Sequence, residues 1–169
     1  MGAYISQRLI RLAADWGACP DALVWLRAKR RRWTDLPREW REWVASHPAT
    51  PVAVLERLAL DADPWVRWEV AQHLAAPVAV LERLALDENE QVREQVARHP
   101  TTPAAVLERL ALDASLWVRG EVARHLAAPV AVLERLALDE NRDVRLAVVS
   151  QLGAHRVWEL RSRIVQAAL

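Results

Sequence analysis

The hydrophobic and polar positions of this chain repeat with a period of 26 residues. The string VLERLALD occurs four times, starting at Val54, Val80, Val106 and Val132. The same interval separates four histidines, His47, His73, His99 and His125. A fixed period between about 20 and 50 residues predicts a solenoid, in which each unit buries its apolar face against its neighbours. We therefore expect four consecutive units, at residues 47–72, 73–98, 99–124 and 125–150.

Each unit contains the signals of two short helices. The first begins at a proline, Pro51 in the first unit, and its apolar residues follow the i, i+1, i+4 spacing of a buried helical stripe. Thr50 precedes this proline and is expected to be an N-cap, as is Thr102 in the third unit. The start of the second helix is marked by four different residues that are all good N-caps, Asp63, Asn89, Ser115 and Asn141. The second helix is short enough to be partly 3₁₀.

The segments that flank the four units predict helical caps. Residues 1–46 are expected to hold an amphipathic helix and one degenerate repeat, because residues 40–46 align with residues 66–72. Residues 151–169 predict a closing helix. Terminal units that differ from the consensus hide the apolar ends of an open stack. We therefore expect one continuous all-α domain.

The segment HPATPVAVLERLALDADPWVRWEVA and its copies resemble the leucine-rich repeat variant family over residues 47–150. This resemblance implies a right-handed superhelix of alternating α-helices and short, often 3₁₀, helices without β-strands. Some members of the family carry an N-terminal iron–sulfur module, and a [4Fe–4S] cluster takes four thiolates. Cys19 is the only cysteine of this chain. We therefore expect no such module and no cofactor.

The spacing of aspartate and Val-Arg in each unit also resembles HEAT repeats. That resemblance implies a ladder of aspartates and arginines between layers. Its members would be Asp61, Arg67, Asp87, Arg93, Asp113, Arg119, Asp139 and Arg145. Four identical copies indicate a structural lattice, because an active site is a single constellation. The chain also lacks a glycine-rich phosphate loop and the common hydrolase motifs, so we expect no enzymatic activity.

The histidine column suggests metal binding, but its spacing argues against it. Packed helices lie about 8–10 Å apart, whereas zinc holds its ligands at about 2.0–2.3 Å. One histidine per layer therefore cannot share a metal with the next. We expect each imidazole to close off the last carbonyls of the second helix, with pH sensing as the alternative.

The second helices diverge between units, whereas the outer surface of the first helices stays nearly constant. A duplicated scaffold that varies on one face suggests a partner there, and tryptophan with arginine is typical of interface hot spots. Neutral drift at solvated positions, or tryptophans packed across the layer seam, would explain the pattern without a partner. Gln95, Gly120 and Ala147 are expected on this variable face as well. Its candidate binding residues are Trp65, Trp68, Glu69, Gln91, Glu94, Arg98, Trp117 and Arg124.

Charge is distributed unevenly along the chain. Residues 1–46 hold nine basic and five acidic residues, and residues 47–150 hold 11 basic and 16 acidic residues. A basic run beside a tryptophan can bind nucleic acid through its phosphate backbone. A solvated face, or a contact with the acidic body of another copy, would explain the run equally. The candidate nucleic-acid residues are Arg27, Lys29, Arg30, Arg31, Arg32 and Trp33.

These observations together favour a non-enzymatic scaffold that binds another protein through the variable face. A nucleic-acid-binding module led by the basic run is the alternative. The first residues lack the pattern of a signal peptide, and no apolar stretch reaches the roughly 18 residues of a membrane span. We therefore expect no membrane partner and a cytoplasmic protein, with a composition typical of bacteria.

Overall fold

The computed structural model describes residues 7–18 and 35–152, and these residues form helices without any strand. The helix α1 (Gln7–Asp15) precedes the stack, and a last helix runs through residues 142–152. Between them lie α3 (Arg38–Ser46), α4 (Val52–Leu58), α5 (Pro64–Gln72), α6 (Val78–Leu84), α7 (Glu90–Arg98), α8 (Ala104–Leu110), α9 (Leu116–Arg124) and α10 (Val130–Leu136). The prediction of an all-α fold is confirmed.

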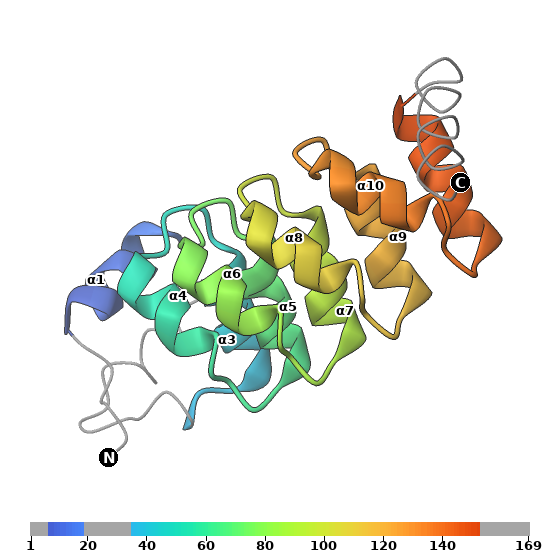
Figure 1. The fold of residues 1–169 in the computed structure, drawn as a ribbon. Coiled ribbons are helices and arrows are strands. Elements are labelled where there is room, and N and C mark those ends of the chain that lie inside the picture. The colour runs from blue at the N-terminus through green and yellow to red at the C-terminus, as the bar shows by residue number, and fades with distance from the viewer. Residues whose placement is uncertain (1–6, 19–34, 153–169) are drawn as a thin grey trace, which may run out of the picture.

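The helices form two rows along one axis (Figure 1). The first helices, α4, α6, α8 and α10, form one row, and the second helices, α3, α5, α7 and α9, form the other. Corresponding helices follow one another at 26-residue intervals, so the stack is the two-helix solenoid that the period predicts. The degenerate repeat contributes α3, which begins and ends 26 residues before α5.

The first helices begin directly after their prolines. Pro51 is the N-cap of α4, and its carbonyl accepts hydrogen bonds from the N–H groups of Val54 and Leu55. The prediction that Thr50 caps this helix is wrong. Its buried hydroxyl donates instead to the carbonyl of Val44, in the last turn of α3. Thr102 donates in the same way to Val96, so these threonines satisfy carbonyls that the end of the preceding helix leaves free.

The second helices begin at the predicted N-cap residues in all four units, and in three of them the side chain caps the helix. The side chains of Asp63, Asn89 and Asn141 accept backbone N–H groups two residues later, at 2.9, 2.9 and 2.8 Å. Ser115 occupies the same position, but its buried hydroxyl has no partner among the described residues. The second helices are α-helical, and the 3₁₀ expectation holds only for the closing bond, as from His73 N–H to the carbonyl of Val70.

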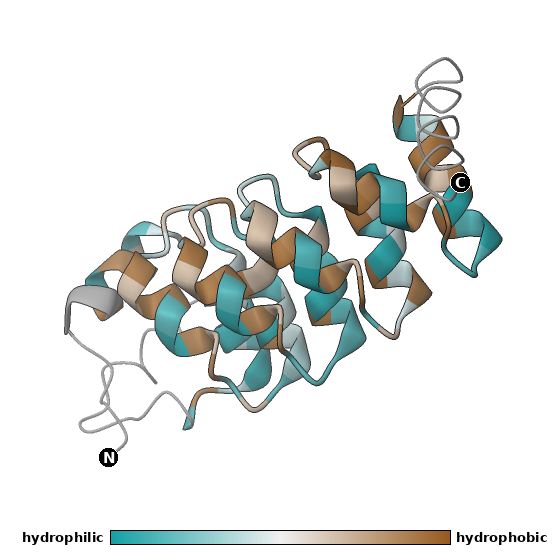
Figure 2. Cartoon of the chain, viewed as in Figure 1, coloured by the Kyte–Doolittle hydropathy of each residue, from teal (hydrophilic) through white to brown (hydrophobic). Residues whose placement is uncertain are grey.

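The core lies between the two rows. Each unit contributes two leucines from its first helix and two valines from its second, which in the first unit are Leu55, Leu58, Val66 and Val70. Helices of seven to nine residues do not persist alone in water, so burial against neighbouring layers must hold them. A leucine that is buried fully contributes about 1.5–3 kcal/mol relative to an exposed one. Figure 2 shows the resulting alternation of apolar and polar segments along the first helices.

Two predicted features lie partly or wholly outside the described residues. The closing helix was expected at residues 151–169, and residues 153–169 are not described. In the described part, the second helix of the last unit runs through residue 152, beyond the predicted unit boundary at 150. Within the described ranges, no helix is long and apolar enough to cross a membrane.

Candidate protein-binding face

The second helices form the tighter of the two rows. The most extensive helix contacts in the described part of the chain join α3 to α5, α5 to α7 and α7 to α9. The variable face therefore belongs to the more closely packed row of the stack.

Two tryptophans of this face are exposed at the same repeat position. Trp65 at the start of α5 is 44% exposed, and Trp117 at the start of α9 is 64% exposed. Trp68 is half-buried and packs against the core, and its ring meets that of Trp65 edge-on at 6.0 Å between centroids. The structure thus leaves Trp65 and Trp117 available to a partner and uses Trp68 as a support.

The charged candidates of α7 and α9 form one network. Arg98 lies 2.9 Å from Glu94 and 3.2 Å from Glu121, and Arg124 lies 3.2 Å from Glu121. Gln91 is exposed on α7, midway in sequence between Trp65 and Trp117. These arginines are therefore held in ion pairs and are not free cations.

Three residues expected on the variable face are buried. These residues are Gln95, Gly120 and Ala147. The prediction was wrong because the second helices pack against one another closely, and this covers part of the surface that a wider spacing would leave open.

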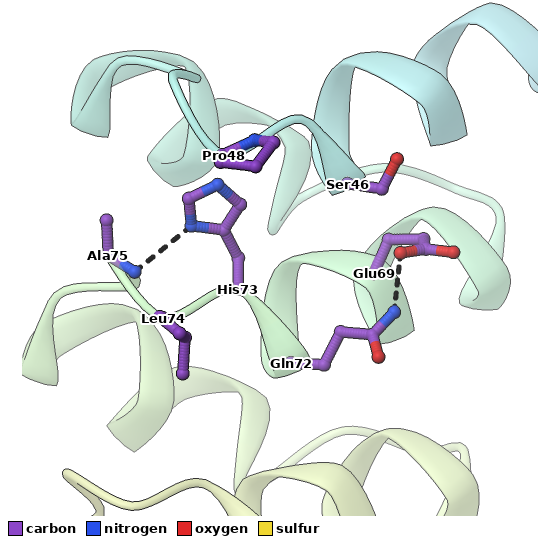
Figure 3. Close-up of a pocket in the computed structure, with 7 residues that line it drawn as sticks. All are labelled: Ser46, Pro48, Glu69, Gln72, His73, Leu74 and Ala75. Atoms are coloured by element: carbon purple, nitrogen blue, oxygen red, sulfur yellow. Dashed lines mark hydrogen bonds between the residues drawn. The ribbon is translucent and has the colours of Figure 1, made fainter.

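A hollow opens beside Glu69, at the end of α5 (Figure 3). It has a volume of about 640 Å³ and is lined by Ser46, Pro48, Glu69, Gln72, His73, Leu74 and Ala75. The Gln72 amide donates to the Glu69 carboxylate. Burial raises the pKa of Glu69, the hydrogen bond from Gln72 lowers it, and the charge of Glu42 raises it further, with a net rise. This part-buried carboxylate was among the candidates, but its hollow was not predicted.

The aspartates and arginines connect successive layers. Nε and Nη2 of Arg67 donate to Asp87 at 2.6 and 2.8 Å, and Nη1 donates to the carbonyl of Asp61 at 2.8 Å. Each arginine thus binds the carboxylate of the next unit, 20 residues on, and a carbonyl of its own unit. The same arrangement joins Arg93 to Asp113 and Arg119 to Asp139. At the two ends, Arg41 pairs with Asp61 at 2.8 Å, and Arg145 donates to the carbonyl of Asp139 at 2.6 Å.

The ladder also favours the charged form of two of its carboxylates, Asp113 and Asp139. Burial acts to raise the pKa of Asp113, but the hydrogen bonds from Arg93 and from the Ser115 N–H outweigh it, and the pKa is lowered. The pKa of Asp139 is lowered by the equivalent groups. Charge is therefore retained inside the stack because each carboxylate has hydrogen-bonded partners.

The histidines form a second ladder. Nε2 of each imidazole donates to the carbonyl of the histidine one layer earlier, at 2.9 Å for His73, 3.1 Å for His99 and 3.0 Å for His125. Nδ1 accepts a backbone N–H two residues on, which requires the neutral tautomer with its proton on Nε2. The imidazoles therefore cap carbonyls of the preceding layer and not of their own helix. Nor does any group of three or more His, Cys, Asp or Glu among the described residues have the geometry to hold a metal ion.

Both ends of this second ladder are closed by other side chains. At one end, Trp16 stacks on His47 with 4.2 Å between ring centroids. At the other end, Gln151 stands where the period would place a histidine, and its Nε2 donates to the carbonyl of His125 at 2.7 Å. A glutamine can therefore replace the donor function of the imidazole without its titration.

This substitution provides a test for the titration of His99. Burial lowers the pKa of His99, the hydrogen bond to His73 raises it, and the neighbouring histidines lower it, with a net decrease. The unfolded value is about 6.5. Because the unfolded chain then binds the extra proton, stability is present above about pH 6.5 and is lost as pH falls through the folded pKa. We expect His99→Gln to lose less stability than wild type between pH 7.5 and 5.5, measured by urea unfolding. An equal decrease in the free energy of unfolding for both proteins over this pH range would contradict the prediction. A difference in stability that is the same at every pH would not affect this comparison.

One family of known proteins matches parts of this architecture. The leucine rich repeat variant family matches residues 38–63 and 90–115. Each matched segment spans one second helix and the following first helix, α3 with α4 and α7 with α8. No curated protein sequence matches the chain. Among solved structures, the crystal structure of an engineered protein is similar with a TM-score of 0.47 and 20% sequence identity, over 87% of this chain and 78% of that chain. This chain is therefore, over its described residues, an all-helical repeat protein with two segments that match the leucine rich repeat variant family.

Proposed function

We propose that this chain is a non-enzymatic scaffold that binds another protein through its variable face. The observation that carries the proposal is the pair of exposed tryptophans, Trp65 and Trp117, at one repeat position two units apart. Large aromatic side chains supply much of the energy of protein interfaces when a partner covers them. Both lie on helices of a packed row, so little flexibility is lost on binding.

The rest of the variable face supports a protein partner. The exposed indoles share this face with the polar side chain of Gln91 and with the neutralised pairs of Arg98 and Arg124. Protein interfaces are enriched in aromatic side chains and also contain polar groups. A nucleic acid would instead call for free cations, which this face does not offer among its described residues.

The test is cross-linking from the centre of the face. A photo-reactive amino acid at Gln91 should capture the partner in the source cells. Trp65→Ala and Trp117→Ala are each expected to weaken the binding of the captured protein by about 2 kcal/mol, measured by calorimetry. Leu86→Ala is the matched control, since Leu86 is also exposed but lies in the turn between α6 and α7. Unchanged affinity in both tryptophan variants would overturn the proposal.

The nucleic-acid alternative gives a different result in the same cells. Binding would fall steeply with salt, because each neutralised phosphate releases counterions. It would be lost when Lys29, Arg30, Arg31 and Arg32 are replaced by alanine, and both tryptophan variants would retain it. These basic residues and Trp33 lie outside the described residues, as does Arg27.

A further inference from the structure

The hollow beside Glu69 contains a carboxylate without a cation. The carboxylate accepts a hydrogen bond from Gln72, and no ion pair joins it to a basic side chain in the described part of the chain. Arg38 is engaged elsewhere, at 2.6 Å from Glu42 and 3.3 Å from Asp63. A part-buried charge that lacks an opposite charge is costly to the fold. The position is therefore suited to a cation that arrives with a ligand.

The chain contains a second version of this hollow 52 residues further on. It has a volume of about 250 Å³, and Glu121 takes the place of Glu69. The proline, histidine, leucine and alanine of the lining are the same in both hollows. Two positions differ, since Arg98 stands where the first hollow has Ser46, and Arg124 stands where it has Gln72.

In the second hollow, these two arginines of the chain itself pair with the carboxylate. Both guanidinium groups lie 3.2 Å from the carboxylate of Glu121. The same scaffold thus shows how a guanidinium is accommodated at this position. The first hollow has the same carboxylate but a serine and a glutamine instead of the two cations, so its space and its negative charge remain available.

We propose that the hollow beside Glu69 binds an arginine side chain of the partner protein. The guanidinium would pair with Glu69 in place of the two missing arginines, and its planar fork suits a carboxylate. Pro48, Leu74 and the ring of His73 offer apolar surface to the methylene stem (Figure 3). Trp65 precedes Glu69 by four residues on α5 and so lies on the same side of the helix. The inference rests on the proposed function, because the arginine would sit beside its first tryptophan anchor.

The experiment compares a cation with its neutral analogue. The full chain, labelled with nitrogen-15, is titrated with Nα-acetyl-arginine amide, with the citrulline analogue and with Nα-acetyl-lysine amide. We expect arginine to shift the signals of residues 69–75 and of the Gln72 side-chain amide, and the other two compounds to bind at least tenfold more weakly. Glu69→Gln should abolish the arginine shifts. Equal binding of citrulline or lysine, or unchanged binding to Glu69→Gln, would overturn the proposal.

The two hollows also provide reciprocal variants. Ser46→Arg with Gln72→Arg copies the second hollow into the first and should close the arginine site. Arg98→Ser with Arg124→Gln makes the opposite exchange and should open a second site beside Glu121, seen as new shifts at residues 121–127. Arginine binding that is unchanged in both double variants would overturn the proposal. If a double variant does not fold, the result for Glu69→Gln decides. Tryptophan-dependent capture of a partner without arginine selectivity would overturn this inference and leave the proposed function standing.

Discussion

Asp87→Ala is expected to lower the free energy of unfolding by about 3–5 kcal/mol, which is the usual cost of removing one partner from a buried ion pair. Asp87 accepts two hydrogen bonds from Arg67, at 2.6 and 2.8 Å, and a third from the N–H of Asn89 at 2.9 Å. Both side chains of the pair are almost completely buried. The substitution leaves a guanidinium between two layers with only backbone carbonyls and the exposed carboxylate of Glu88 as partners. Urea unfolding of the two proteins measures the difference.

The neighbouring residue provides a matched control for this prediction. Glu88 also pairs with Arg67, at 3.4 Å, but its side chain is 88% exposed. Exposed ion pairs contribute little, so Glu88→Ala should change the free energy of unfolding by less than about 0.5 kcal/mol. A cost below 1 kcal/mol for Asp87→Ala would show that water replaces the carboxylate, and that the ladder orders charges without stabilising the stack.

The period and the residue types predicted the fold because a solenoid is determined by contacts between nearest neighbours. Prolines, N-caps and apolar spacing recur in each unit, so four copies report the same local structure. The details that failed depend on the distance between layers. Thr50 precedes a helix in sequence but reaches back to the end of α3, and Gln95 is covered by the close packing of the second helices. Both contacts join neighbouring units, so the sequence of a single unit does not predict them.

The candidate site was predictable only in part, for a similar reason. The sequence identified Trp65 and Trp117 but left open whether they pack across the layer seam, and only their exposure answers this. The absence of cations beside Glu69, by contrast, can be detected in the sequence. Aligning the chain with itself at 52 residues places Ser46 opposite Arg98 and Gln72 opposite Arg124. That difference acquires a meaning only once both arginines are seen to bind one carboxylate.

The two leucines at opposite ends of LERLAL should differ sharply in their contribution to stability. Leu107 is fully buried between the rows, whereas Leu112 is 69% exposed in the turn that follows α8. Leu107→Ala removes apolar contacts and leaves a cavity that short, stacked helices cannot close without shifting a layer. We expect it to lower the free energy of unfolding by about 2–5 kcal/mol. Leu112→Ala should cost less than about 0.5 kcal/mol.

Urea unfolding followed by circular dichroism tests both leucine variants. Each unit is stabilised by its neighbours, so the curve of Leu107→Ala should move as one transition to lower urea and should not split into two. A split would mean that the layers on either side of α8 unfold independently. A large loss in Leu112→Ala would contradict the exposure of this leucine in the single chain. Sedimentation of wild type and variant would then show whether another copy covers Leu112. If it does, the wild type would sediment as an oligomer and Leu112→Ala as a smaller species.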